Sequence, residues 1–296
     1  MYRRQIKYLN QNKQDITIRE LLKKWLIPKK WQHFFRIQKD VLINGKYHPF
    51  NTIVKNDDVI TLNFDFPPRS KNQTYLPGNR NINVCYEDKD IIVVNKQAGI
   101  KSHPNLPTEN DSLMNDVESY LAPNEHPYMV HRIDKDTSGL MLIAKTPYLV
   151  PILDRQLSTK LLHREYLAIV KLNQPLTESS GTIDIPIGND PEDKRKRMTR
   201  PDGQNAITKY NVIKQNKKYA LLRLNLLTGR THQLRVHLSS KNWPIVNDLL
   251  YNPEPKNGNL LLFAHELNFI TPFSDDILTV EADLPDFMTD FITNEF

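Results

Sequence analysis

The 296-residue chain lacks several features on which large classes of proteins depend. Its single cysteine, Cys85, cannot form an intramolecular disulfide, so we interpret it as a small core residue in a reducing, cytoplasmic setting. No run of 18 apolar residues occurs, and residues 1–14 lack the apolar stretch of a secretion signal, so no membrane association is expected. The nine histidines form no cluster with cysteine, and His232 and His237 stand five residues apart, so no metal site is expected.

The positive charge is concentrated near the N-terminus. The chain has a net charge of +6, and residues 1–65 hold 13 of its 40 Lys and Arg but only 6 of its 34 Asp and Glu. All the excess positive charge therefore lies in this first segment. A compact basic module beside a nearly neutral body is typical of proteins that bind a polyanion, although a solubilising basic tail would have the same composition.

The first 80 residues predict a small module followed by a linker. Apolar side chains recur there at three- and four-residue steps, as in a helix: Ile18, Leu21, Leu22 and Trp25. Pro28 ends that run, a second short helix is expected over residues 31–37, and residues 41–64 predict short strands joined by tight turns. We therefore predict an α/β module over residues 1–66. The polar, proline-rich residues 67–80 predict a linker.

The body, residues 81–296, predicts an α+β domain. Strands are expected in residues 83–96, where two of them flank an acidic turn, and over 163–172, 218–230 and 260–272. Helices are expected over residues 148–160 and 231–241. Because strands rarely alternate with long helices, the pattern favours a mixed, mostly antiparallel central sheet with flanking helices over a doubly wound parallel sheet.

The densest polar stretch is MVHRIDKDTSGLMLIAK, residues 129–145, which leads directly into an apolar, strand-like segment. Its DKDTSG part has the oxygen spacing of a calcium loop, but Lys145 stands where such a loop needs a bidentate carboxylate. HRID is similar to the kinase H-R-D segment, but Asp134 comes one residue late and no glycine-rich phosphate loop precedes it. A capped turn accounts for residues 136–139, but not for Arg132 beside Asp134.

These residues resemble the RluA/RluD-type family of RNA pseudouridine synthases, whose H-R-L-D-x-x-T-S-G segment stands here as residues 131–139. Further family segments follow the same order along the chain: IIVVNKQAGIKSHP, HREYLAIV, GTIDIPI, GQNAITKY, GRTHQLRVH and NWPIVNDLLY. The chain departs from the family pattern at Gln97, Arg164, Asn242, Trp243, Asn247 and in LFAHEL. Residues 1–65 resemble the αL RNA-binding module of ribosomal small-subunit protein S-four.

The resemblance implies a reaction that breaks the glycosidic C–N bond of a uridine, rotates the uracil and rejoins it through carbon, without a cofactor or metal. Asp134 is then the catalytic carboxylate, which either attacks the anomeric carbon or removes a sugar proton. A buried carboxylate stays ionised only beside a cation, and the resemblance assigns that cation to Arg235. Tyr166 is then expected to stack on the target base. Arg132 is expected to fill the gap left by the flipped base, with a salt bridge to a neighbouring aspartate as its alternative role.

Four more residues are assigned to substrate binding on the same basis: His131, Thr137, His232 and Lys96. A helix from Thr231 would place His232 and Arg235 on one face. The basic run KRKRMTR, residues 194–200, is either a solvated loop or a phosphate contact.

The expected partner is RNA, with ribosomal RNA favoured over transfer RNA, and the expected state is a monomer. A binding protein without catalysis is the main alternative. A hydrolase that uses Asp134 and His131 is a more distant one, since no nucleophile elbow or metal set accompanies them.

Overall fold

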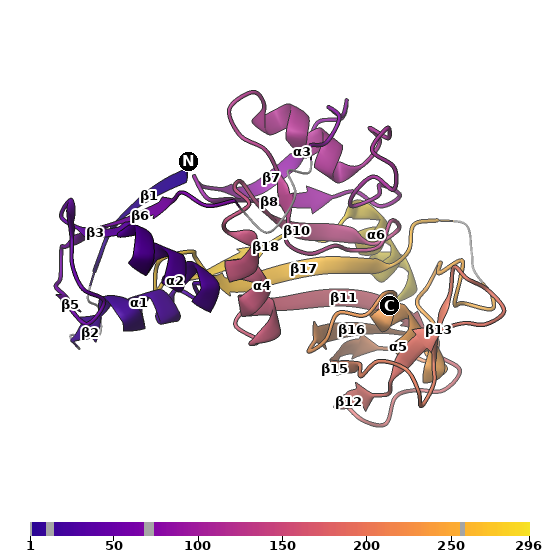
Figure 1. Cartoon of the computed structure of the whole chain (residues 1–296). Coiled ribbons are helices and arrows are strands. Elements are labelled where there is room, and N and C mark those ends of the chain that lie inside the picture. The colour runs from indigo at the N-terminus through magenta and orange to yellow at the C-terminus, as the bar shows by residue number, and fades with distance from the viewer. Residues whose placement is uncertain (1, 10–14, 68–73, 255–257) are drawn as a thin grey trace.

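Two sheets organise the computed structural model, a small one near the N-terminus and a large one that runs through the rest of the chain (Figure 1). The structure describes residues 2–9, 15–67, 74–254 and 258–296. Part of the expected linker, residues 68–73, lies outside these ranges. In the described residues, no helix has the length and apolar character needed to cross a membrane.

The small sheet and two helices form the N-terminal module. Its strand order is β1 (Tyr2–Lys7), β6 (Val59–Phe64), β3 (Val41–Ile43) and β4 (Lys46–Tyr47), and the short strands β2 (Ile16–Thr17) and β5 (Ile53–Val54) form a separate pair. The helices α1 (Ile18–Lys24) and α2 (Lys29–Gln38) confirm the pair expected on either side of Pro28. Helix α1 begins at Thr17 because the Thr17 hydroxyl accepts from the backbone N–H of Glu20, whose carboxylate accepts from the backbone N–H of Thr17.

In the described residues, the large sheet has ten strands. Eight of them lie in the order β12 (Ser180–Asp184), β15 (Ile207–Gln215), β16 (Tyr219–Leu226), β11 (His163–Lys171), β17 (Leu262–Ile270), β10 (Ser138–Ala144), β8 (Ile91–Lys96) and β7 (Asn83–Glu87). β18 (Ile277–Glu281) pairs with β17, and β9 (Tyr128–Met129) pairs with β10. Only β10 and β17 pair in parallel among these strands, so the expectation of a mixed, mostly antiparallel sheet is confirmed.

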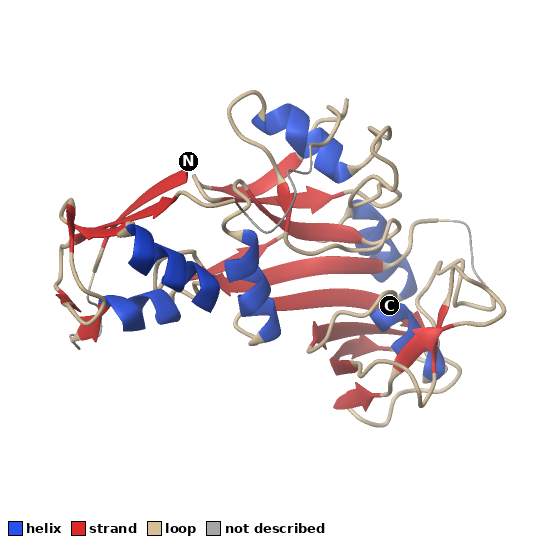
Figure 2. Ribbon diagram, viewed as in Figure 1, coloured by secondary structure: helices blue, strands red, loops and turns tan. Residues whose placement is uncertain are grey.

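Helices flank the large sheet, as Figure 2 shows. They are α3 (Leu113–Leu121), α4 (Val150–Ser158), α5 (Gln233–Ser240) and α6 (Asp286–Glu295). A two-stranded arm, β13 (Ile187–Asn189) and β14 (Arg197–Thr199), projects beside α5. The arm carries most of the basic run 194–200.

The N-terminal module and the body share one aromatic core. The module contributes Phe64 and Phe66, and the body contributes Tyr148 from the residues just before α4. The Phe64 and Tyr148 rings lie 4.8 Å apart between centroids, and the Tyr148 hydroxyl donates to the carbonyl oxygen of Phe66 at 2.7 Å. Arg4 of the module also pairs with the buried Asp90 at 2.5 Å. The module is therefore packed against the body rather than merely tethered to it.

The described end of the expected linker, residues 74–80, is also anchored. The backbone N–H of Gly78 donates to the carbonyl oxygen of Asn115 at 2.8 Å, and the Asn115 side chain donates to the carbonyl oxygen of Leu76 at 2.7 Å. The Arg80 guanidinium pairs with Asp116 at 2.9 Å. This part of the chain thus follows the surface of α3.

Gly139 allows the one parallel contact of the large sheet to form. It has a φ of +113°, and a Cβ at this position would lie 2.3 Å from the carbonyl oxygen of Ala264 on β17. A side chain would therefore separate β10 from β17 directly after the polar stretch 131–137.

We predict that Gly139→Ala lowers the free energy of unfolding by roughly 2–4 kcal/mol, because it combines a collision with backbone strain. Gly45→Ala is the matched control, since Gly45 also has a positive φ, +81°, but no atom lies within 4 Å of its Cβ position. Urea denaturation of both variants measures the difference. Equal losses in the two variants would show that the close approach to Ala264 carries no cost.

Candidate active site

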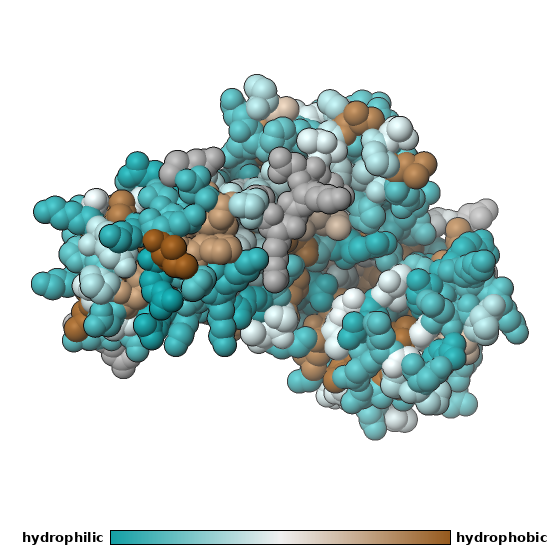
Figure 3. All heavy atoms as spheres, in the orientation of Figure 1, coloured by the Kyte–Doolittle hydropathy of each residue, from teal (hydrophilic) through white to brown (hydrophobic). Residues whose placement is uncertain are grey.

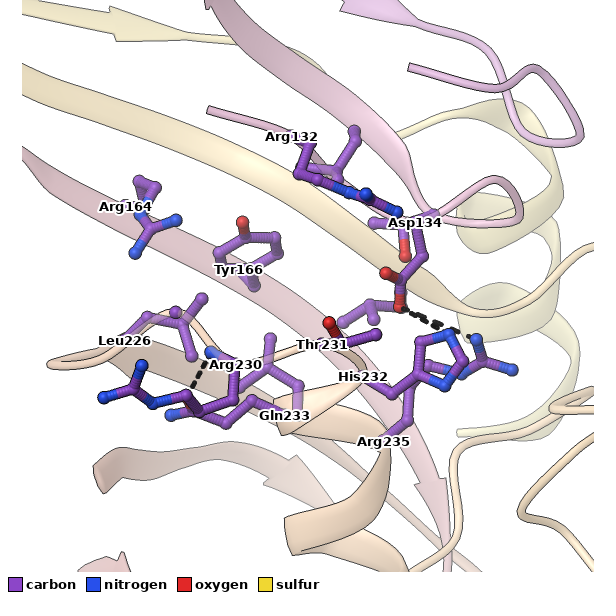
Figure 4. A pocket seen from close by; sticks show the side chains of 15 residues that line it. Arg132, Asp134, Arg164, Tyr166, Leu226, Arg230, Thr231, His232, Gln233 and Arg235 are labelled. Atoms are coloured by element: carbon purple, nitrogen blue, oxygen red, sulfur yellow. Dashed lines mark hydrogen bonds and ion pairs between the residues drawn. The ribbon is translucent and has the colours of Figure 1, made fainter. Parts of the chain in front are cut away.

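A pocket opens where the segment before β10, one face of β11 and the start of α5 meet (Figure 4). Six of the eight site residues predicted from the sequence line it: Arg132, Asp134, Thr137, Tyr166, His232 and Arg235. The other two, His131 and Lys96, do not line it. Among the described residues, no three His, Cys, Asp or Glu side chains are grouped so that they could hold a metal ion.

The Asp134 carboxylate faces the pocket and is 19% exposed. Its loop is held from below, because the Ser102 hydroxyl donates to the carbonyl oxygen of Ile133 at 2.6 Å and accepts from the backbone N–H of Ile133. Within the described residues, no hydrogen bond to the Asp134 side chain is found. A capping aspartate would accept such a bond from a nearby backbone N–H, so the geometry does not fit a capped turn at this residue.

Lys96 supports the same loop from inside the protein. Its ammonium group donates to the carbonyl oxygens of Gln97, Ile100 and Lys135 at 2.8–2.9 Å. Burial lowers the pKa of Lys96 to about 7, although the carboxylates of Asp136 and Asp134 oppose the shift. A side chain that donates three hydrogen bonds is a charged ammonium group, and here it links two loops. Lys96 therefore stabilises the loop of Asp134 from inside the protein and does not lie at the pocket surface.

His131 lies in the core beneath the pocket. Its Nε2 accepts from the backbone N–H of Leu142 on β10 at 3.0 Å, which requires the neutral ring. Burial lowers the pKa of His131 to about 3, in agreement with that state. The structure thus makes His131 a backbone partner of β10. Thr137, in contrast, is buried but lines the pocket.

Arg235 is the buried cation closest to Asp134. Its Nη1 lies 3.6 Å from Oδ2 of Asp134, while its Nε and Nη2 donate to Asp248 at 2.8 and 2.7 Å. The guanidinium also lies 5.1 Å from the ring centroid of Tyr251. Burial lowers the pKa of Arg235, but the hydrogen bonds and charge of Asp248 outweigh it, so the net pKa is raised. The guanidinium is therefore held in place by Asp248 and presents its remaining edge to Asp134.

His232 does not belong to α5, and the expectation of a helix from Thr231 is wrong. His232 has a left-handed backbone conformation, with φ of +57°, and the helix begins at Gln233. The Gln233 side chain accepts from the Thr228 hydroxyl at 2.8 Å and from the backbone N–H of Arg230 at 3.0 Å, and so stabilises a turn there. His232 nevertheless reaches the same pocket from its turn.

The His232 ring is oriented by a tyrosine. Its Nδ1 lies 2.8 Å from the Tyr251 hydroxyl, and its Nε2 lies 3.9 Å from Oδ2 of Asp134. Burial lowers the pKa of His232, the charge of Asp134 opposes the shift, and that of Arg235 adds to it. The ring is thus neutral at neutral pH, which leaves Arg235 as the cation that faces Asp134.

Tyr166 stands on β11 and is only 4% exposed. A buried tyrosine usually bonds its hydroxyl, yet no partner for this hydroxyl occurs in the described part of the chain, and the ring faces the pocket (Figure 4). Burial raises the pKa of the Tyr166 phenol, Arg164 lowers it and Asp134 raises it, with a net increase. The neutral phenol is available to a bound molecule rather than used in the core.

Arg132 lies exposed at the pocket rim. Its Nη1 lies 3.2 Å from Nε2 of His103, and no ion pair joins it to Asp134 or Asp136 in the described structure. The alternative role of a salt bridge within its own loop is therefore not observed.

Asp248 and Tyr251 were not predicted as site residues. Both occur in NWPIVNDLLY, a segment that resembles the family as a whole. The missed signal was physical: a buried arginine needs a counter-charge of its own before it can serve a second carboxylate. The backbone N–H groups of Leu250 and Tyr251 also donate to Asp248, so this one aspartate positions both Arg235 and Tyr251.

Comparisons with known proteins show the family to which the chain belongs. Residues 90–240 match the RNA pseudouridylate synthase family, and residues 6–60 match the N-terminal domain of the ribosomal pseudouridine synthase RluD. The chain is 33% identical over 263 residues to the RNA pseudouridine synthase YlyB of Bacillus subtilis, covering 86% of this chain and 85% of that protein.

A second relative and a solved structure extend the match. Ribosomal large subunit pseudouridine synthase D of Buchnera aphidicola is 31% identical over 295 residues, covering 93% of this chain and 88% of that protein. The solved structure of human RNA pseudouridylate synthase domain containing 4 superposes with a TM-score of 0.59 at 25% identity, over 71% of this chain and 92% of that chain.

The fold and site are those of an enzyme that isomerises uridine in RNA. The chain belongs to the RNA pseudouridine synthase family, and within it to the RluA/RluD type with an N-terminal module. The family match favours neither the non-catalytic binding protein nor the hydrolase considered from the sequence.

We predict that Asp248→Asn lowers the free energy of unfolding by about 3 kcal/mol or more, because it leaves Arg235 buried without its counter-charge. Asp134→Asn is the matched control. It removes a partly exposed carboxylate 3.6 Å from the same guanidinium and should cost less than about 1 kcal/mol. Urea denaturation at pH 7 compares the two. If Asp248→Asn is as stable as the wild type, Asp248 is not what keeps Arg235 in place.

Proposed function

We propose that the enzyme converts uridine to pseudouridine in structured ribosomal RNA, and that Asp134 acts on the ribose of a uridine flipped out of its helix or loop. The observation that carries the proposal is the environment of Asp134. Its carboxylate is partly exposed to the pocket, accepts no hydrogen bond within the described residues, and faces the buried cation Arg235 at 3.6 Å. A group placed in this way is available to a substrate.

The reaction needs one carboxylate and no redox change. The C1′–N1 bond breaks, a C1′–C5 bond forms, a base takes the proton from C5, and N1 gains a proton, so substrate and product are isomers. Asp134 serves either by attack on C1′ or by removal of a sugar proton, and the guanidinium of Arg235 lies 3.6 Å from its carboxylate in both cases. Tyr166 supplies an aromatic face for the uracil and a neutral phenol beside it.

Base flipping follows from where the pocket lies. Asp134 and Tyr166 are recessed between β11 and the start of α5, so a uridine stacked within folded RNA cannot reach them. Arg132 stands exposed at the rim with a planar guanidinium that pairs with no carboxylate in the described chain, which suits it to stack where the base had been.

Ribosomal RNA is our preferred substrate because of the relatives and the N-terminal module. The matched N-terminal domain is that of a ribosomal pseudouridine synthase, and the Buchnera relative is named for the large ribosomal subunit. The exposed cations of α1 and α2 lie on a largely hydrophilic face of the module (Figure 3). Transfer RNA is the second choice. The monomeric state and the cytoplasmic setting stay predictions.

We predict that Asp134→Asn abolishes pseudouridine formation and leaves RNA affinity within a few-fold of the wild type, because it removes the reacting group and little contact area. Release of tritium from RNA labelled at C5 of uridine measures turnover, and filter binding measures affinity. Substantial tritium release by this variant would contradict the role given to Asp134.

A second prediction concerns the charge of the N-terminal module. Deleting the module would expose Tyr148 and Phe273, which share its core, so charge variants test the module more cleanly. We expect Lys23→Gln, Lys29→Gln and Arg36→Gln together to weaken RNA binding. The slope of log affinity against log salt should fall by roughly one unit for each phosphate that the variant no longer neutralises. An unchanged slope would leave the module without a phosphate-binding role.

A further inference from the structure

Two cations, Arg164 and Arg230, line the end of the pocket that lies away from Asp134, and a third, Lys160, lies near them outside the lining. Arg164 stands on β11 two residues before Tyr166 and so shares its face of the strand, Arg230 comes shortly before α5, and Lys160 follows α4. Figure 4 shows Arg164 and Arg230 on the far side of Tyr166 from Asp134. The pocket thus has a carboxylate at one end and two guanidinium groups at the other. With the neighbouring Lys160, these two arginines form what we call the cationic cluster.

The members of this cationic cluster are close enough to repel one another. The Lys160 ammonium donates to the carbonyl oxygen of Leu227, in the same turn as Arg230. The Arg164 guanidinium lies against Gly229, where a Cβ would be 3.1 Å from its Nη2. Burial lowers the pKa of Lys160, and the charges of Arg164 and Arg230 lower it further.

No carboxylate of the described chain forms an ion pair with any of the three. Other cations of the protein have such partners, as Arg235 has Asp248 and Lys145 has Glu87. A cluster of like charges without counter-ions raises the free energy of the empty protein, and a bound anion would relieve that repulsion.

The cluster also marks a path out of the pocket. Residues 229–231 line both the pocket and a polar groove that runs toward the β13–β14 arm. Arg197 and Arg200 of the basic run line this groove, and the backbone N–H of Arg197 donates to the Tyr251 hydroxyl at 2.8 Å. The arm is therefore connected to the catalytic pocket through Tyr251, the partner of His232.

We propose that Lys160, Arg164 and Arg230 bind a backbone phosphate of the RNA immediately beside the uridine that enters the pocket. The inference rests on the proposed function, because it requires a nucleotide whose ribose lies at Asp134. A phosphate that flanks this nucleotide along the strand would then meet two guanidinium forks and an ammonium group at the end of the pocket beyond Tyr166. The contact lies away from the reacting atoms, so it contributes to binding of substrate and transition state alike.

The test uses the full-length protein and an unmodified transcript of large-subunit ribosomal RNA labelled with tritium at C5 of uridine. We expect Arg164→Gln and Arg230→Gln each to lower kcat/KM roughly tenfold, through KM, and to leave kcat within about threefold. The slope of log affinity against log salt should fall by roughly one unit for each variant. Arg164→Lys retains the charge and should retain the slope.

Lys217→Gln is the matched control. Lys217 is likewise cationic. It is exposed on the turn between β15 and β16, at the other end of β16 from the pocket. The proposed phosphate site is contradicted if Arg164→Gln and Arg230→Gln change KM and the salt slope no more than Lys217→Gln does. This conclusion does not depend on how fast the wild type turns over. If the wild type releases no tritium from any RNA, the proposed function fails. The salt slope still decides the phosphate site in that case.

Discussion

A buried arginine that needs two carboxylates determines how this active site is built. Asp248 accepts from Nε and Nη2 of Arg235 and neutralises the guanidinium, and Nη1 lies 3.6 Å from Oδ2 of Asp134. Asp248 also accepts from the backbone beside Tyr251, and Tyr251 orients His232. The pocket therefore depends on an ion pair of which Arg235 lines the pocket and Asp248 does not. Removing the charges of Arg235 and Asp248 from water costs free energy, and this cost is offset only because both charged groups are hydrogen-bonded.

The loop of Asp134 is fixed from the opposite side by groups that were first considered for substrate binding. Lys96 donates to three carbonyl oxygens beneath it, and His131 accepts from β10, the strand that follows. Gly139 then lets that strand approach β17 closely. Of the polar side chains in the stretch 131–137, Arg132, Asp134 and Thr137 line the pocket, whereas His131 holds the backbone of the strand that follows.

Periodicity and family segments predicted several strands of the large sheet, the helices α1, α2 and α4 and most of the pocket, since these depend on local patterns. Tyr166 and Arg235 were found in this way. The helices α3 and α6 and the strand β18 were not predicted. The start of α5 was predicted two residues too early. His232 has a left-handed backbone, and the Gln233 side chain stabilises a turn before the helix, so α5 begins only at Gln233. Asp248 was missed because its partner, Arg235, lies 13 residues away, beyond the reach of helix or strand periodicity. Arg235 needs a counter-charge only because it is buried, and the sequence pattern does not show that burial. The docking of the N-terminal module through Phe64 and Tyr148 was equally invisible to local patterns.

The most direct test of the central claim is a pseudouridine map of total RNA from cells with and without the gene, made with a chemical label that stops reverse transcription at pseudouridine. The account predicts at least one stop in ribosomal RNA that disappears without the gene. The wild-type protein should restore it, and the Asp134→Asn protein should not. A map that is unchanged by loss of the gene, in cells where no other enzyme covers the same sites, would contradict the account.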